Sequence, residues 1–493
     1  SAPPLPTAEY GPAPLSYAQQ RLWFLHDFDP DSTEYTVVTA LRLRGALDTG
    51  ALGAALSGIV ARHETLRTTF STVDGDPVQV VQPAEPVTVR LEDLTGRTDL
   101  TLEECLRQEA ARPFDLGWGP VFRATLIRLG EQDHVLAFLA HHIAVDGWSL
   151  DLLTRELEVE YGAALRGERA EHPPLAVRYA DYAAWQRNLV NGQAMERHLD
   201  YWRDRLAGVR PLDLPTDLPR PPVRSGAGRR HTFHVPAPVV SRLRELGGGN
   251  GATLFMTLAT AVKVVLARWS GRQDIAVVTP LSGRDRVEVD DVVGFFVNTV
   301  VLRTSIDETL SFTETLRSVR LTTLDAMANG SVPFQKVVEA LRPERDPSRP
   351  VLAEATVSLI GAPPRPVEVP GLRIEEIDPP VVTVDADVSF EFAERDGALV
   401  AHVGYTTDLF TEATAERMAG HLLTLLRGVT DRPEAPLATV PMTSGEETRR
   451  LVTEWGGTFE HPAPRTVPEL FADQVARDPD AVALVSEEGT LSY

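Results

Sequence analysis

The segment Ala140–Ser149, AHHIAVDGWS, holds the residue types and spacing best suited to chemistry. His141 and His142 directly follow the apolar run VLAFLA, whose length and composition are typical of a fully buried strand. Histidine exchanges protons near neutral pH, so an imidazole at the end of such a strand is a candidate general base. The whole pattern HHxxxDG, at the end of a strand and ahead of a helix, favours acyl-transfer chemistry.

Asp146 and Gly147 complete this pattern. Asp146 lies four residues after His142, where it can orient the imidazole, brace the loop through an arginine, or do both. Gly147 permits a backbone with positive φ and lets a substrate approach the main-chain N–H groups closely. Those N–H groups lie near the start of the next helix, which Ser149 is placed to cap, and they can stabilise a developing oxyanion.

Two other interpretations of the histidines compete with catalysis. A buried histidine is more often a satisfied core residue than a catalyst, and only the complete pattern decides for catalysis. The HxxxD spacing also suggests a metal pair, but zinc needs three or four ligands, and no further His, Cys and Asp cluster lies nearby in the sequence. We therefore expect no metal site.

The elements that position this segment alternate between helical and strand patterns. Apolar residues recur at helical spacing in 15–28, 51–69 and from Ser149 onward, whereas 35–43 and 134–140 are typical of strands. A second α/β series follows the proline-rich stretch 211–222, which is the best candidate for a linker between two lobes. Its expected helices are 253–269, 312–327 and 411–427, and its expected strands are 274–279, 292–304, 351–360, 381–392 and 398–404. The pattern predicts an α/β or α+β fold with two lobes of comparable size.

Composition excludes several classes of function. The 48 Lys and Arg residues against 70 Asp and Glu residues give a net charge of −22, which repels nucleic acid and anionic lipid. The single cysteine, Cys105, allows no internal disulfide and no CxxC motif. No uncharged apolar run approaches the ~20 residues of a membrane span, and the start lacks the order of a signal peptide. We predict a cytoplasmic protein that binds neither nucleic acid nor membrane.

The segment HHIAVDGWS resembles the active-site motif of the condensation domains of non-ribosomal peptide synthetases, within the chloramphenicol acetyltransferase-like superfamily. Further stretches resemble the other family motifs, in the family's order, from Leu15 to Leu352. These stretches are Leu15–Leu25 (LSYAQQRLWFL), Arg62–Phe70 (RHETLRTTF), Tyr179–Trp185 (YADYAAW), Val293–Arg303 (VGFFVNTVVLR), Val332–Gln335 and Arg345–Leu352 (RDPSRPVL). Seven ordered matches are far more specific than HHxxxDG alone.

The resemblance implies two chloramphenicol acetyltransferase-like lobes in a V shape with a central tunnel. An acyl or peptidyl thioester on an upstream peptidyl carrier domain and an aminoacyl thioester on a downstream one would enter the tunnel on their phosphopantetheine arms. The downstream amine then attacks the upstream thioester and forms an amide. The resemblance implies no cofactor held by this chain itself.

The resemblance also assigns the site residues. It implies that His142 is catalytic, as a base or by holding the amine, and that His141 is a less critical neighbour. Asp146 would be structural and paired with Arg284, and Gly147 would be a backbone donor. The remaining assignments are Trp148, which lines the acceptor channel or simply packs, Asn298 as a tunnel residue, and Arg67, Trp202 and Phe296 as scaffold.

The tail from Val467 resembles the start of an adenylation domain. The predicted domains are a leader or linker (1–14), the N-terminal lobe (15–180) and C-terminal lobe (181–440) of the condensation domain, a linker (441–466) and the adenylation fragment (467–493).

The subtype is less well defined by the residues. WSLDLLTREL and YTVVTALRLRG favour a domain that joins L-donors to L-acceptors, with a residue-modifying domain, for example a dehydrating one, as an alternative. A non-catalytic recruitment platform is the other rival, against which the intact HHxxxDG argues.

Plant-type CoA acyltransferases are a rival family, and they carry a DFGWG-like motif far after the histidines. The DLGWG of Asp115–Gly119 lies before them, and we interpret it as a coincidence.

Overall fold

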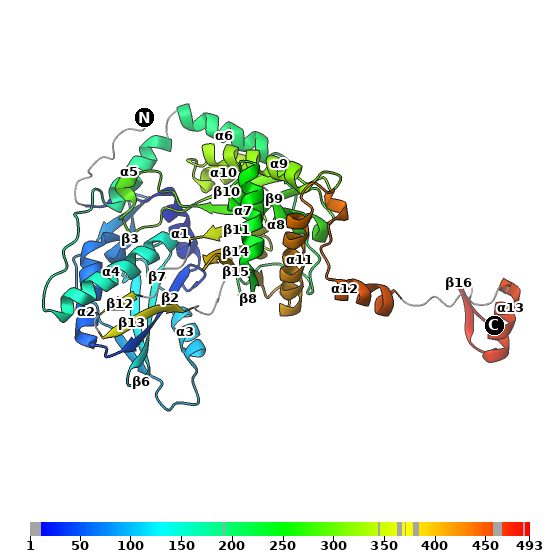
Figure 1. The fold of residues 1–493 in the computed structure, drawn as a ribbon, viewed down its shortest axis with the longest axis horizontal. Coiled ribbons are helices and arrows are strands. Elements are labelled where there is room, and N and C mark those ends of the chain that lie inside the picture. The colour runs from blue at the N-terminus through cyan, green and yellow to red at the C-terminus, as the bar shows by residue number, and fades with distance from the viewer. Residues whose placement is uncertain are drawn as a thin grey trace. The chain divides into compact units, whose positions relative to one another are not determined.

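The computed structural model describes residues 11–190, 193–343, 346–361, 367–369, 371–377, 384–456, 466–486 and 489–493 (Figure 1). Internal contacts divide the chain into two units, Ser1–Met442 and Thr443–Tyr493. Most of the predicted leader, and residues 457–465 of the predicted linker, lie outside the described residues.

The first six-stranded sheet carries the two histidines at the end of strand β7. Its strand order is β12-β13-β2-β7-β6-β5, so β7 lies between β2 and β6 and is antiparallel to both. Every residue of β7 from His134 to His141 is buried, as the run VLAFLA predicts. The strands are β2 (Thr36–Gly45), β5 (Arg90–Asp93), β6 (Phe122–Gly130), β7 (Asp133–His141), β12 (Val367–Val369) and β13 (Leu372–Ile377).

Of the helices that precede the second sheet in the chain, α2 and α4 contact each other closely, whereas α6 contributes Met195, Trp202 and Leu206 to the apolar core of the second half. These helices are α1 (Tyr17–Phe28), α2 (Thr49–Arg62), the 3-10 turn η1 (Glu64–Arg67), α3 (Leu102–Ala110), α4 (Gly147–Leu165), α5 (Tyr179–Val190) and α6 (Gln193–Leu206). A small sheet has the order β1 (Ala13–Pro14), β4 (Asp76–Val81), β3 (Thr68–Val73). The helix expected over 51–69 is wrong at its end, because α2 stops at Arg62 and strand β3 begins at Thr68.

The second six-stranded sheet has the order β10-β9-β11-β14-β15-β8. Its strands are β8 (Gly228–Val235), β9 (Asp274–Leu281), β10 (Asn298–Ser305), β11 (Ala355–Ile360), β14 (Val388–Arg395) and β15 (Ala398–Thr406). Its helices are α7 (Ala237–Gly249), α8 (Leu254–Ser270), α9 (Phe312–Ala328), α10 (Phe334–Leu341) and α11 (Glu412–Asp431), with 3-10 turns η2 (Val287–Val289) and η3 (Leu437–Thr439). These elements share one apolar core with α8 deep inside it. The predicted mixed α/β class is confirmed.

One hairpin from the second half of the chain joins the first sheet. Strand β13 pairs antiparallel with β2, Leu372 opposite Gly45, and β12 extends the edge. Gly45 has φ +128°, and a Cβ there would lie 2.1 Å from the carbonyl oxygen of Gly371, so this pairing requires glycine. The sequence analysis places residues 367–377 in the C-terminal lobe, and nothing in their local pattern predicts that they cross over.

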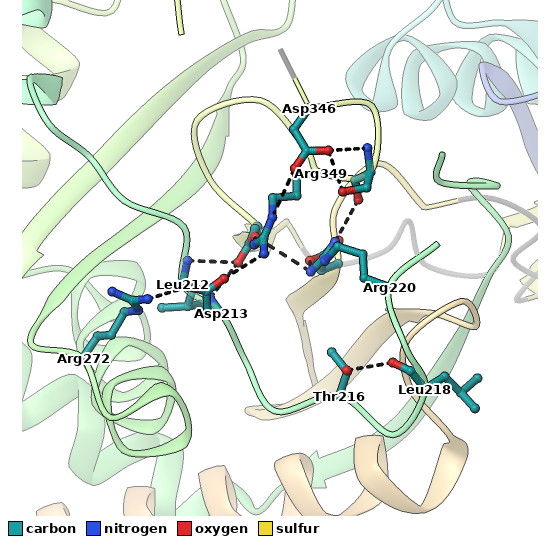
Figure 2. Close-up of polar contacts among 11 residues, drawn as sticks. Leu212, Asp213, Thr216, Leu218, Arg220, Arg272, Asp346 and Arg349 are labelled. Atoms are coloured by element: carbon teal, nitrogen blue, oxygen red, sulfur yellow. Dashed lines mark hydrogen bonds and ion pairs between the residues drawn. The ribbon is translucent and has the colours of Figure 1, made fainter. Parts of the chain in front are cut away.

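The proline-rich segment expected to link the lobes is pinned to the second half by charges (Figure 2). Arg349 lies 2.8 Å from Asp213 and also contacts Glu354. The Glu354 carboxylate accepts the backbone N–H of Asp213 at 3.1 Å and lies 3.8 Å from Arg220. The proline-rich segment is therefore fixed to the second half of the chain at Asp213 and Arg220.

In the second unit, Thr443–Tyr493, the residues that the structure describes form short elements. They are α12 (Gly445–Arg450), the π-helical turn η4 (Leu451–Trp455), α13 (Val467–Arg477) and a hairpin of β16 (Val482–Ser486) and β17 (Gly489–Ser492). In the part of the chain that the structure describes, no single helix is long and apolar enough to cross a membrane. One bent pair, α7 with α8, meets that criterion by length and composition alone.

Candidate active site

His142 follows the last residue of β7 and is held at both its backbone and its ring. Its N–H donates to the carbonyl of Tyr35 at 2.8 Å, and its Nδ1 lies 2.6 Å from the carbonyl oxygen of Val145. A carbonyl can only accept, so Nδ1 carries the proton of the neutral ring and Nε2 keeps a free lone pair. The half-buried ring packs against Phe295, with 4.6 Å between the ring centroids. The local backbone thus prepares Nε2 as a hydrogen-bond acceptor.

His141 has a different environment. It is buried, its Nδ1 accepts the N–H of Ile143 at 3.1 Å, and its ring lies 6.3–6.4 Å from those of His26, Tyr35 and Phe114. Burial, assisted by His142 and His26, lowers the pKa of His141 to about 3. A ring that stays neutral near pH 7 serves as part of the wall behind His142.

Asp146 is fully buried and caps helix α4. Its Oδ1 accepts the N–H of Ser149 at 2.8 Å and the Ser149 hydroxyl at 2.6 Å, and its Oδ2 accepts the N–H of Phe296 at 3.1 Å. Among the hydrogen bonds of the described residues, none joins Asp146 to His142. Of the two roles left open for this aspartate, the geometry therefore supports bracing the loop, while Val145 orients the imidazole.

Arg284 comes from the loop after β9 and reaches Asp146. Its Nη2 lies 3.2 Å from Asp146 Oδ1, within the salt-bridge distance expected for the pair, and both side chains are buried. Its Nη1 donates to the carbonyl of Val289 and, at 2.9 Å, to that of Val292. Its guanidinium lies 4.1 Å from the centre of the Phe296 ring. Arg284 thus joins the loops of the second half to the start of α4.

The crossing segment, Val293–Phe296, runs between β9 and β10 and is held residue by residue by the first half of the chain. Its bonds are Thr65 Oγ1 to the Val293 carbonyl at 3.0 Å, Gly294 N–H to Ser149 Oγ at 3.0 Å, Tyr179 OH to the Phe295 carbonyl at 2.6 Å, and Phe296 N–H to Asp146 Oδ2. Since Phe295 packs on His142, this segment forms one wall of the site. It was expected to begin a strand, which in the structure starts only at Asn298.

Tyr179 and Gly294 are site residues that the sequence analysis did not single out. A Cβ on Gly294 would lie 2.1 Å from Tyr179 Cδ2, so the crossing segment can pass the tyrosine ring only as glycine. Tyr179 is buried, its hydroxyl also lies 2.9 Å from Ser16 Oγ, and burial raises its pKa well above the ordinary value. Both residues lie in the quoted stretches YADYAAW and VGFFVNTVVLR, but only the tertiary contact assigns them a role.

Gly147 corrects one expectation. It is the first residue of α4, it is exposed, and its φ is not positive, because the helix begins at this position. A Cβ at Gly147 would meet no atom within 4 Å. The missing side chain therefore leaves open space next to the active-site loop, and the first-turn N–H groups of α4 lie beside that space.

Trp148 and Asn298 have the contacts of bracing residues. Trp148 is about half exposed, and its Nε1 donates to the carbonyl of Asp290 at 3.0 Å. The Asn298 amide donates to the carbonyls of Gly330 and Val332, at 2.8 and 2.6 Å, and accepts the N–H of Phe334 at 2.9 Å. Both ends of the Asn298 amide are thus bonded to the backbone. The role of Asn298 as a tunnel residue stays a prediction.

The residues predicted as scaffold are engaged in packing. Arg67 donates to the carbonyls of Val60 and Gln82, Trp202 is buried and donates to the Asn329 carbonyl at 3.0 Å, and Phe296 is buried. In the described ranges, no group of three or more His, Cys, Asp or Glu side chains is arranged to hold a metal ion.

Comparison with protein families gives a match over most of the chain. Residues 10–452 match the family described as the condensation domain. The chain is 39% identical to a linear gramicidin synthase of Brevibacillus parabrevis, over 99% of this chain and 10% of that protein. It is 38% identical to the chondramide synthase cmdD of Chondromyces crocatus, over 100% of this chain and 13% of that protein. The chain thus spans about a tenth of these relatives.

Solved structures show the same architecture. The X-domain from teicoplanin biosynthesis is 29% identical, with a TM-score of 0.81, over 89% of this chain and 99% of the X-domain. A holo four-domain nonribosomal peptide synthetase bound to AMP and glycine matches at a TM-score of 0.81 over 100% of this chain and 38% of its own, and at 24% identity it shows the fold alone. These matches confirm the predicted condensation-domain fold, of chloramphenicol acetyltransferase type. The chain therefore belongs to the condensation-domain family of nonribosomal peptide synthetases, acyltransferases that form amide bonds.

Proposed function

We propose that this domain joins an acyl or peptidyl thioester on an upstream peptidyl carrier domain to an aminoacyl thioester on a downstream one. The downstream α-amine attacks the upstream thioester carbonyl, a C–N bond forms and the C–S bond breaks. The amine loses a proton, and the departing sulfur leaves as the thiol of the upstream phosphopantetheine arm. Both substrates arrive on such arms through a tunnel between the lobes, and this chain holds no cofactor of its own.

The observation that carries the proposal is the hydrogen bond from His142 Nδ1 to the Val145 carbonyl. Because it leaves Nε2 as an acceptor, His142 can hold the attacking amine by its N–H and accept its proton. The first-turn N–H groups of α4, starting at Gly147, can stabilise the oxyanion that develops on the thioester carbonyl. Proton transfer contributes ~10²–10⁴ in rate. Positioning two bound reactants can contribute ~7–11 kcal/mol, so we assign the larger share to positioning.

A condensation assay tests the proposal. Two loaded carrier domains are mixed with the protein, and the dipeptidyl product is measured by mass spectrometry. His142→Ala is expected to abolish the product without a change in the folded structure, because the Nε2 acceptor is lost. His234→Ala, on an exposed residue of β8, is the matched control and is expected to retain full activity. Near-wild-type product from His142→Ala would refute the assignment.

We propose L-donors and L-acceptors as the natural substrates. The segments WSLDLLTREL and YTVVTALRLRG support this preference. The same assay with L- and D-loaded donors tests it, and equal or faster reaction of the D-donor would contradict it. A modifying subtype that dehydrates the residue would instead give a product lighter by one water.

A second candidate function is a recruitment platform without catalysis. One observation favours it: the X-domain that is 29% identical to this chain was also solved in a complex with OxyB. The intact HHxxxDG and the prepared Nε2 of His142 support catalysis instead. A folded protein that gives no product with any carrier-bound pair would favour the platform.

We also propose that residues 467–493 are the start of an adenylation domain in a cytoplasmic synthetase. The alignments with multidomain relatives continue through 99% of the chain, whereas the condensation match ends at residue 452. Removal of residues 467–493 is then expected to leave condensation activity intact, and a loss of activity would contradict this division.

A further inference from the structure

A cavity of about 730 Å³ lies beside strands β3, β5 and β6 and the turn Asp115–Gly119, the DLGWG segment that has no place among the family motifs of this chain. Its size is within the range of small-molecule sites. The whole chain has a net charge of −22, but the lining of this cavity is basic. The charged lining residues are Arg67, Arg90, Arg112 and Arg123, against the single carboxylate of Glu85.

Two of these arginines converge on one buried carboxylate. Arg90 Nη1 lies 2.7 Å from Glu109 Oε1, and Arg112 Nη1 lies 3.1 Å from Glu109 Oε2, which also accepts the hydroxyl of Thr125 at 2.9 Å. The arginine side chains remain 52% and 48% exposed, whereas that of Glu109 is 6% exposed. Glu109 therefore holds two open guanidinium groups next to each other in the lining of the cavity.

Arg112 keeps one edge of its guanidinium group free. Its bonds to Glu109 all come from Nη1, and within the described residues its Nε and Nη2 have no acceptor. The N–H groups of Nε and Nη2 lie parallel on the same edge of the planar group, so they match the two oxygens of a carboxylate. Arg90 is less available, because its Nη2 also lies 3.3 Å from Glu92.

Arg67 and Arg123 add positive charge to the same lining. Both donate to backbone carbonyls, and no carboxylate of the described residues forms an ion pair with either. Burial, and after it the repulsion from Arg112, lower the pKa of Arg123 to about 10, although Glu109 acts in the opposite direction. An anion in the cavity would supply the negative charge that these arginines lack.

Trp118 supplies an aromatic surface in the lining. It is 88% exposed, and its backbone is fixed by the turn, because Asp115 Oδ1 accepts the N–H of Gly117 at 2.9 Å and that of Trp118 at 3.0 Å. The Asp115 carbonyl also accepts the N–H of Gly119 at 2.8 Å. An indole presented in this way can stack with another aromatic ring. Apolar lining residues continue the wall: Leu66, Val87 and Pro120.

We propose that this cavity binds a small aromatic carboxylate, which accepts hydrogen bonds from Nε and Nη2 of Arg112 and stacks its ring on Trp118. The carboxylate brings both the charge and the two acceptors that fit the free edge of the arginine, which a neutral alcohol cannot do. No lining residue takes part in the hydrogen bonds described for His142 or Asp146, so the site does not depend on the condensation reaction.

Three probes with a six-membered ring test the site on the full chain: benzoate, cyclohexanecarboxylate and benzyl alcohol, measured by ligand-observed NMR titration at constant ionic strength. Small probes of this size bind with Kd values of ~1 mM or weaker. Benzoate is expected to bind at least tenfold more tightly than benzyl alcohol, which has no charge to pair with Arg112. It is expected to bind at least threefold more tightly than cyclohexanecarboxylate, which has no π-system to stack on Trp118.

Arg112→Gln is expected to weaken benzoate binding at least tenfold and to leave the binding of benzyl alcohol unchanged. Arg107→Gln is the matched control. Arg107 lies on α3, is 49% exposed, pairs with Glu103 and is not part of the cavity lining, so its loss changes the net charge equally. It is expected to change benzoate binding less than twofold. Circular dichroism and thermal unfolding verify that both variants are folded.

Trp118→Ala tests the aromatic part of the proposal and, at an exposed position, is expected to keep the unfolding midpoint. It should weaken benzoate binding at least threefold and so remove the preference for benzoate over cyclohexanecarboxylate. The proposal is overturned if the three probes bind equally, if Arg112→Gln and Arg107→Gln weaken benzoate equally, if Trp118→Ala keeps that preference, or if no probe saturates up to ~50 mM.

Discussion

Arg284 reaches Asp146 across 138 positions of the chain, with Nη2 3.2 Å from Oδ1 and with 2% and 0% of the two side chains exposed. The carboxylate also caps α4 and accepts the N–H of Phe296, so one aspartate joins a helix start, an arginine loop and the crossing segment. In a buried pair of this kind, the loss of one partner leaves the other charge without compensation.

Asp146→Ala is therefore expected to lower the free energy of unfolding by about 3–5 kcal/mol. Tryptophan fluorescence in a urea titration measures this loss. Asp133→Ala is the control, because Asp133 pairs with Arg42 at 2.6 Å while both side chains are about a third exposed. It is expected to cost less than ~1 kcal/mol. Similar losses for the two variants would contradict a bracing role for Asp146.

Gly294→Ala is expected to destabilise the protein by about 1–3 kcal/mol, the cost of overpacking. The new Cβ would lie 2.1 Å from Tyr179 Cδ2, and moving that ring breaks its bond to the Phe295 carbonyl. Gly53→Ala in α2 is the control, since a Cβ there meets nothing within 4 Å and alanine favours a helix. A Gly294→Ala protein as stable as Gly53→Ala would show that the crossing segment adjusts freely.

Substitutions at Gly147 test whether substrates use the open space beside it, because they are expected to change the condensation rate without changing the stability. No atom lies within 4 Å of the missing Cβ, so Gly147→Ala and Gly147→Leu are expected to keep the unfolding midpoint. If substrates occupy that space, the leucine variant loses at least tenfold in condensation rate and the alanine variant loses less. Full activity of Gly147→Leu would mean that this space is not used.

The sequence predicts the parts of the site that a single segment specifies. His141, His142 and Asp146 were identified because a buried strand, a short loop and a helix cap follow one another directly. The Asp146–Arg284 contact was predicted as well, but through a family resemblance that links two separate motifs.

The rest depends on contacts that no local pattern encodes. Gly294 and Tyr179 have meaning only once the two halves meet, because the glycine is required by a ring 115 positions away. The strand pattern of β13 is visible in LRIEEI, but the register that joins it to β2 is set by a close approach at Gly45. The tautomer of His142 likewise follows from the turn that brings the Val145 carbonyl to Nδ1.

His141 predicts an acid-sensitive stability. Its folded pKa of about 3 lies below the unfolded value of ~6.5, so between these values only the unfolded chain binds the proton. The contribution is constant above pH 6.5, and stability falls as the pH drops toward 3, by up to ~1.4 kcal/mol per pH unit. His141→Asn keeps an acceptor for Ile143 and is expected to flatten this fall. In urea titrations from pH 7 to 4, an unchanged slope would contradict the burial of a neutral ring, and exposed His234→Asn is the control.

Lys263 predicts that the stability of the protein also depends on pH in the alkaline range. It is fully buried on α8 and donates to the Leu302 carbonyl at 2.6 Å and to Thr304 Oγ1 at 2.8 Å. Burial, with a smaller effect of Arg205, lowers its pKa to about 7. Between that value and the unfolded value of ~10.4 the unfolded chain binds more protons, so stability rises with pH by up to ~1.4 kcal/mol per unit.

Lys263→Met is expected to remove this rise between pH 7 and 10, because the variant has no amine to titrate in either state. Lys336→Met is the control, since Lys336, the only other lysine in the sequence, lies at the surface, 2.7 Å from Glu339. Its curve of unfolding free energy against pH should parallel the wild type. If the two variants have parallel curves, the amine of Lys263 is charged in the folded protein at pH 8 and its two acceptors outweigh the cost of burial.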